Sequence, residues 1–189
     1  MKLFMWAFIG LLLTILGTFQ QAFIASLHWN ANQPDIHPQP LGITCQIGAV
    51  LLVGCLGGKN AGALAQVLYL VLGLGLIGEL SIFTHGGGLS YMEKPSFGYL
   101  LGFVPGAWVC GYFAFKTRPK LESLGFSCIC GLAVIHVIGL AYTLVLRAFS
   151  ADLLQLILVY SLRPLPAQIG MACAVAVIAF LLRRLLFIK

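Results

Sequence analysis

The residues best suited to ligand chemistry lie in one stretch, 83–103, which combines small, polar and aromatic side chains. Its three successive glycines permit positive φ angles and close approach of the backbone, so exposed N–H and C=O groups can meet a small ligand directly. Several hydroxyls, an imidazole and several aromatic rings in this stretch add polar and stacking partners. This composition predicts a ligand-binding loop, with a plain connection between two helices as the alternative. The candidate ligand-binding residues here are Thr84, His85, Gly86, Gly87, Gly88, Phe97 and Tyr99.

Two stripes of small residues at a four-residue spacing predict close helix packing, which is a main source of helix association in a bilayer. The first comprises Gly98, Gly102, Gly106 and Cys110. Its partner is expected to be another helix of the same bundle, with a separate subunit as the alternative. The second stripe begins with Gly10, Thr14 and Thr18 in the first apolar segment. Because that segment stands at the N-terminus, we predict that this stripe contacts a partner subunit.

The motifs of intramembrane enzymes are absent from the sequence: it holds no Gly-x-Ser-Gly turn, no His-Glu-x-x-His and no Cys-x-x-Cys. His136 lies inside an apolar segment, where a histidine with a structural hydrogen-bonding role is expected. The six cysteines lie mostly in apolar stretches without zinc-ligand spacing. We therefore predict no enzymatic activity, no catalytic residues, no cofactor and no metal.

The elements that must position these residues are membrane helices. The 189-residue chain is 60% hydrophobic and 8% charged, whereas soluble domains carry about 25% charged residues. This composition excludes a water-soluble monomer and predicts an all-α integral membrane protein whose outer surface contacts the lipid bilayer. The net charge of +6 does not indicate nucleic-acid binding, because the basic residues stand singly between apolar runs.

Six apolar segments predict six transmembrane helices in a single domain spanning residues 1–189. Most are near or above the roughly 20 residues that cross a bilayer. The connections at 57–60 and 116–122 are expected to be tight turns. Those at 28–42, 81–96 and 150–165 are expected to be longer loops on one side, and the three prolines of 28–42 favour an extended chain. The predicted helices are about 3–27, 43–58, 61–80, 97–115, 123–149 and 166–188.

The distribution of Lys and Arg predicts the orientation of these helices. If the N-terminus is cytoplasmic, eight of the 11 basic residues fall on the cytoplasmic side, and three, Lys94, Arg147 and Arg163, fall on the other. Basic residues near helix ends are retained in the cytoplasm. Both termini are therefore expected inside and the long loops outside.

Two blocks of sequence resemble the BioY family, the biotin-specific substrate-binding (S) components of energy-coupling-factor (ECF) transporters. Residues 40–46 resemble the family's Pro-x-x-Thr-x-Gln motif, and residues 95–103 resemble its Pro-Thr-Gly-Gly-Tyr-Leu-Leu-Gly-Phe signature. The resemblance implies an S-component-like bundle of six helices in the cell (plasma) membrane, with both termini cytoplasmic and an outward-facing vitamin pocket. It also implies biotin as ligand, and an ECF transmembrane coupling subunit and ATPase subunits as partners.

The sequence departs from the family pattern at the start of the last predicted helix. The family's Pro-x-Pro-Gly-Asp-x-x-Lys motif is matched here by residues 164–171, with Gln168 in place of the Asp and Met171 in place of the Lys. By resemblance, residue 168 meets the ureido ring of biotin, so the Gln168 amide oxygen is expected to accept one ureido N–H. Arg163 is the nearest basic residue that would replace the missing cation.

We predict that the protein functions in biotin uptake, as a binding component that has no nucleotide site of its own. The sequence has no Walker motif, so energy must come from separate ATPase subunits. The alternatives are an S component for another small vitamin or a biotin analogue, an intramembrane enzyme, and an assembly protein that binds nothing.

Overall fold

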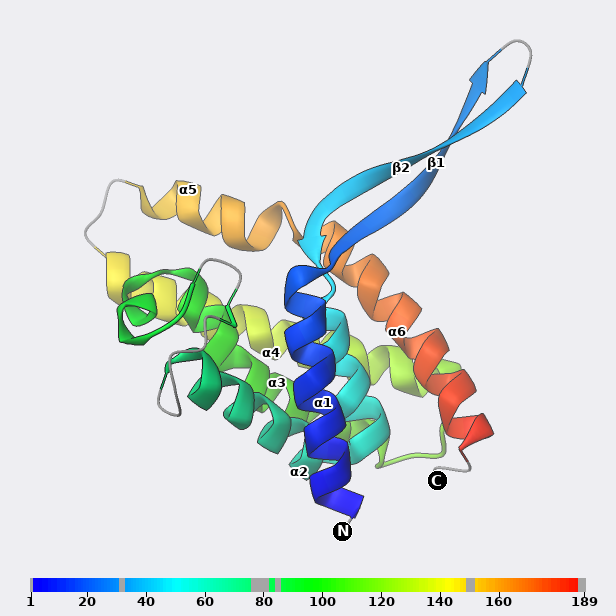
Figure 1. Cartoon of the computed structure of the whole chain (residues 1–189), viewed down its shortest axis with the longest axis horizontal. Coiled ribbons are helices and arrows are strands. Elements are labelled where there is room, and N and C mark those ends of the chain that lie inside the picture. The colour runs from blue at the N-terminus through cyan, green and yellow to red at the C-terminus, as the bar shows by residue number, and fades with distance from the viewer. Residues whose placement is uncertain (1, 31–32, 76–81, 84–85, 149–151, 187–189) are drawn as a thin grey trace.

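The computed structural model describes residues 2–30, 33–75, 82–83, 86–148 and 152–186, and side chains are not described for residues 26–37. The protein is mostly helical, with a two-stranded ribbon that projects from one end of the helical bundle (Figure 1). The elements in chain order are α1 (Lys2–Phe19), β1 (Gln21–Asn30), β2 (Gln33–Thr44), α2 (Gln46–Gly73), η1 (Leu89–Glu93), α3 (Ser96–Ala114), α4 (Leu121–Arg147), α5 (Leu153–Ile157), η2 (Leu158–Leu162) and α6 (Leu165–Leu185).

The described part of the chain has five helical segments long and apolar enough to cross a membrane: α1, α2, α3, α4 and the segment from α5 to the end of α6. Between 28% and 61% of the residues in their most apolar windows are buried within the protein. One face of α1 leaves large apolar side chains exposed, including Phe4, Phe8, Leu12 and Leu16. Such a face suits contact with lipid tails, so the structure is that of a membrane protein.

The first helix ends earlier than predicted. The expected helix at 3–27 stops at Phe19, because the following residues pair with β2 in an antiparallel ribbon. The polar residues Gln20 and Gln21 interrupt the apolar run at this point, and the Gln20 carbonyl accepts a hydrogen bond from the Cys45 N–H. The prolines of β2 are tolerated because an isolated ribbon has an unpaired outer edge where no N–H is required.

Most of the second and third predicted helices lies in α2, which is interrupted at Gly58, and residues 76–80 of the third lie outside the described residues. This glycine has φ +81° and ψ 177°, a conformation that interrupts the helix. A Cβ on Gly62 would lie only 3.2 Å from the Cα of Gly54, whereas residues eight apart in a straight helix are separated by about 12 Å. The chain therefore folds back on itself here, at the turn that was predicted at 57–60.

The small stripe on α3 packs against α4, as predicted for a partner within the same bundle. A Cβ on Gly102 would lie 2.9 Å from the Ile135 carbonyl oxygen, and one on Gly106 would lie 3.1 Å from the Gly131 carbonyl oxygen. Only glycine lets the two backbones approach this closely.

The prediction that the stripe on α1 contacts a partner subunit is wrong. Thr14 and Thr18 are buried inside the chain, with 0% and 1% of their surfaces exposed. Gln66 Nε2 on α2 donates a hydrogen bond to Thr14 Oγ1 (3.0 Å). A Cβ on Gly10 would lie 2.9 Å from the Cβ of Ala65, also on α2. The small residues admit α2, so this face of α1 is already covered.

The connection predicted as a loop at 150–165 is largely helical. It contains α5 and the π-helical turn η2, in which the Arg163 N–H donates to the Leu158 carbonyl (2.9 Å). Leucine and isoleucine in this segment favour helix once it packs on the bundle. In Figure 1, α5 crosses the end of the bundle from which the ribbon projects, while α1 begins and α6 ends at the opposite end.

Candidate ligand-binding pocket

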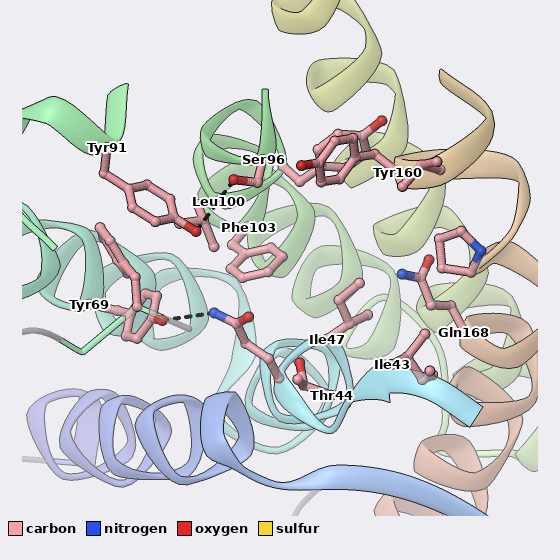
Figure 2. A pocket seen from close by; sticks show the side chains of 16 residues that line it. Ile43, Thr44, Ile47, Tyr69, Tyr91, Ser96, Leu100, Phe103, Tyr160 and Gln168 are labelled. Carbon is pink, nitrogen blue, oxygen red and sulfur yellow. Dashed lines mark hydrogen bonds between the residues drawn. The ribbon is translucent and has the colours of Figure 1, made fainter. Parts of the chain in front are cut away.

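A pocket of about 310 Å³ opens at the end of the bundle where β2 meets α2 and where α3 and α6 begin (Figure 2). This volume falls within the range of sites for small molecules. Sixteen described residues line the pocket, and none of them is Asp, Glu, Lys, Arg or His. Its polar groups are hydroxyls and the amides of two glutamines, so the described lining is uncharged.

Tyr69 is the centre of a hydrogen-bond network on one side of the pocket. Its hydroxyl accepts a hydrogen bond from Gln46 Nε2 (2.9 Å) and donates to the Ile82 carbonyl (3.3 Å). It also lies 3.0 Å from Thr18 Oγ1. Because the Gln46 amide nitrogen is used in this way, the amide oxygen is the group left to accept a hydrogen bond from a ligand.

A wall of aromatic rings continues from Tyr69 through Phe83 and Tyr91, which flank the glycine loop (residues 86–88). Phe83 lies 5.3 Å from Tyr69 and 4.8 Å from Tyr91, measured between ring centroids. A Cβ on Gly73 would overlap the Phe83 ring, so the absence of a side chain there makes room for Phe83. The Gly88 N–H donates to the Gly73 carbonyl (2.9 Å), which ties the loop to the end of α2. The loop thereby presents both rings to the pocket.

A second network joins four elements on the opposite side of the pocket. Tyr99 on α3 has its hydroxyl 2.6 Å from Ser161 Oγ on η2. Ser161 Oγ lies 3.2 Å from His136 Nδ1 on α4. His136 Nε2 lies 2.7 Å from Gln168 Oε1 in the first turn of α6. All four side chains are buried, so the network holds Gln168 at the pocket wall.

Two of the residues predicted from sequence line this pocket, Tyr99 and Gln168. Phe97 is buried beside it, with its ring 5.9 Å from that of Tyr142. Gly86, Gly87 and Gly88 are not among the lining residues and act through the loop that they form. Thr84 and His85 lie outside the described residues.

The cation predicted from sequence, Arg163, and the position of the family's Lys both lie away from the described pocket. Arg163 is exposed at the end of η2 and is not among the lining residues. Residue 171, where the family pattern has Lys, does not line the pocket either: the Met171 side chain lies against Gly48 in the contact between α6 and α2. No cation of α6 or η2 therefore faces the pocket among the described residues.

Several lining residues were not predicted as site residues: Gln46, Tyr69, Tyr91 and Tyr160. Gln46 stands within the block at 40–46 that carries the family resemblance, so the motif itself was the available signal. Tyr160 has no such signal, because the sequence predicts a loop for its segment. The π-helical turn directs Tyr160 to the pocket and its neighbour Ser161 to the buried network.

Three buried thiols form a separate cluster in the core. Cys55, Cys110 and Cys128 have Sγ atoms within 4.8 Å of one another, and each side chain is completely buried. Cys55 Sγ lies 3.6 Å from each of the other two sulfur atoms. These small residues stand where α2, α3 and α4 cross, so the cluster serves helix packing.

Comparison with known proteins places the chain in one family. Residues 13–187 match the BioY family. An uncharacterized 21.2 kDa protein from the psbX-ycf33 intergenic region of Cyanophora paradoxa is 33% identical over 182 residues, which cover 96% of this chain and 94% of that protein. The probable biotin transporter BioY of Lysinibacillus sphaericus is 40% identical over 107 residues, which cover 56% of this chain and 53% of that protein.

A solved structure has the same fold. The crystal structure of the S-component for biotin from an ECF-type ABC transporter superimposes with a TM-score of 0.69 at 24% identity. The superposition covers 97% of this chain and 90% of that one. This similarity shows the fold, and the family match over residues 13–187 shows that the chain belongs to the BioY family.

Proposed function

We propose that this protein is the substrate-binding S component of an ECF transporter and that it binds biotin for uptake. The pocket at the ribbon end of the bundle is the observation that carries this proposal. Relatives from Lysinibacillus sphaericus and Thermotoga maritima named as biotin transporters support the choice of ligand. Their aligned regions span only 53% and 57% of their lengths, so biotin enters as a proposal for this chain.

The chemistry of the pocket fits the two rings of biotin, which combine an apolar thioether ring with a polar, neutral ureido group. Leu100, Phe103 and the aromatic wall supply apolar surface. The Gln46 amide oxygen can accept a ureido N–H, and tyrosine hydroxyls add further partners. Tyr99 and Gln168 are proposed to contact the ligand directly, while the glycine loop positions Phe83 and Tyr91. The uncharged lining suits the ureido group better than an unpaired carboxylate.

The proposed topology has six membrane spans in one domain, with both termini in the cytoplasm and the pocket facing outward. The reversal at Gly58 supports two spans within α2. The start of α1 and the end of α6 lie together at the end opposite the ribbon (Figure 1). Lys59 and Lys116 lie near Leu3 at that same end, and Arg184 is in the last turn of α6, as retention of basic residues in the cytoplasm requires.

The proposed partners are an ECF transmembrane coupling subunit and ATPase subunits in the plasma membrane. Support comes from the family assignment and from the lack of a Walker motif in the sequence. The buried stripe on α1 is not proposed as their contact surface, because α2 occupies it.

The test is retention of tritiated biotin by the detergent-purified chain, followed by uptake in a biotin auxotroph with and without co-expressed ECF subunits. Tyr91→Ala removes a ring from the pocket wall and should lower affinity by at least about tenfold, equivalent to about 1.4 kcal/mol. Tyr112→Ala removes an exposed tyrosine at the other end of the protein and is the matched control. Absence of biotin retention by the folded natural chain would refute the proposal.

A further inference from the structure

The direction of each hydrogen bond in the buried network can be assigned from its atoms. Gln168 Oε1 can only accept, so His136 Nε2 carries the hydrogen that joins them at 2.7 Å. In a neutral imidazole the other ring nitrogen, Nδ1, then accepts a hydrogen bond, which the Ser161 hydroxyl donates. Ser161 Oγ in turn accepts from the Tyr99 hydroxyl. Donation thus runs in one direction, from Tyr99 to Gln168.

The contact with His136 also shows which end of the Gln168 amide faces the pocket. The oxygen is held by His136, so the NH₂ group is left for a ligand. Figure 2 shows the amide nitrogen of Gln168 pointing toward the middle of the pocket. An NH₂ group only donates. The expectation that the Gln168 oxygen accepts a ureido N–H is therefore not supported by this arrangement.

We propose that Gln168, oriented by His136, determines specificity by donating a hydrogen bond from its NH₂ group to the ureido carbonyl oxygen of the ligand. The inference rests on biotin being the ligand. Biotin offers two strong acceptors, the ureido carbonyl and the carboxylate. The described lining carries no full positive charge, and a carboxylate buried without a cation would be costly. The uncharged NH₂ group of Gln168 therefore suits the neutral ureido carbonyl better than the carboxylate.

The decisive variant is Gln168→Glu, which has the same length. One carboxylate oxygen can keep the bond to His136, while the other faces the ligand as an acceptor. The probe ligand is 2-iminobiotin, in which a donor-bearing imino group replaces the ureido oxygen. The natural chain should bind biotin at least about tenfold more tightly than 2-iminobiotin. Gln168→Glu should weaken biotin at least about tenfold and reverse the preference. Gln155→Glu, the same change at an exposed position on α5, should leave the ratio unchanged.

The role of the network is tested separately with Ser161→Ala. Without the serine hydroxyl, His136 Nδ1 loses its donor, and the imidazole and Gln168 are free to exchange donor and acceptor. The ratio of affinities for biotin and 2-iminobiotin should then fall by at least about threefold. A purely structural role of Ser161 would lower the thermal midpoint without changing this ratio, and that result would contradict the proposed orientation.

Biotin methyl ester distinguishes the two acceptors of the ligand. If the ureido carbonyl meets residue 168, Gln168→Glu should change the affinities for biotin and its ester by the same factor. A selective loss of the free acid would show that the carboxylate meets residue 168, and tighter biotin binding by Gln168→Glu would show that an acceptor is preferred there. Either result overturns the inference. If the natural chain binds no biotin at all, the proposed function fails first.

Discussion

At the scale of single residues, the Tyr69 hydroxyl joins more of the pocket than any other group described above. It accepts from Gln46, donates to the Ile82 carbonyl and lies beside Thr18. Tyr69→Phe keeps the ring but leaves these buried polar groups without their shared partner. We expect a loss of about 1–3 kcal/mol in stability, together with weaker biotin binding because Gln46 loses its anchor. Thermal unfolding in detergent and equilibrium biotin binding measure the two effects.

The control for this change is Tyr112→Phe, at an exposed tyrosine far from the pocket. Its effect on stability should stay within about 0.5 kcal/mol. If the two variants behaved alike, the hydroxyl of Tyr69 would not be organising the site.

Gly88 has a backbone conformation that would strain any other residue. Its φ is +87° and its ψ is 175°, and no atom beyond Gly88 and its two chain neighbours lies within 4 Å of the position that a Cβ would occupy. Gly88→Ala therefore meets no steric overlap, and its cost should be that of a positive-φ, extended backbone conformation that is essentially restricted to glycine, about 1–3 kcal/mol. Because the loop positions Phe83 and Tyr91, biotin affinity should fall with stability. Melting curves and binding isotherms of the variant provide the measurement.

Gly170 on α6 provides a matched comparison, because its Cβ position is also open and its backbone is helical. Gly170→Ala should stabilise the protein by up to about 1 kcal/mol. Stabilisation by Gly88→Ala as well would show that the glycine loop tolerates other conformations.

At the scale of elements, the crossing of α3 over α4 sets the separation of the helices that carry Tyr99 and His136. A Cβ on Gly102 would lie 2.9 Å from the Ile135 carbonyl oxygen and 3.0 Å from the Ile135 Cα, both backbone atoms of α4. Gly102→Ala must therefore push the two helices apart. We expect a loss of about 1–3 kcal/mol and weaker biotin binding, measured by thermal unfolding and by titration with biotin.

Gly125, which lies in α4 with open space around its Cβ position, is the control for the crossing. Gly125→Ala should leave biotin binding unchanged. A binding defect in this variant would point to a general effect of alanine on α4 and away from helix separation.

At the scale of the whole molecule, the proposed orientation predicts which surface water-soluble reagents reach. Gln39 is exposed on the ribbon and Thr117 is exposed in the turn after α3, at opposite ends of the protein. In intact cells, an impermeant thiol reagent should label Gln39→Cys, while Thr117→Cys should react only after the membrane is permeabilised. Each variant is compared with the natural chain to subtract its six cysteines. Labelling of Thr117→Cys in intact cells would show that the protein has the opposite orientation in the membrane.

The membrane class, the pairing of α3 with a neighbouring helix and the family were predictable from sequence because each depends on local features. Apolar segments must be long enough to cross lipid, small residues at a four-residue spacing form one helix face, and motifs are contiguous. The block at 95–103 likewise contains Tyr99, Leu100 and Phe103, which line the pocket.

Tertiary structure alone decided what residues distant in sequence do together. Gly10, Thr14 and Thr18 form a stripe that suits any close partner, and only the fold shows that α2 fills that place. Residues 21–27, predicted as the end of the first helix, form a strand because β2 pairs with them. Gln168 can donate or accept, and its role is decided by His136, 32 residues away in the chain. Sequence specifies which groups are present, whereas the direction of a hydrogen bond depends on the partner that the fold brings to it.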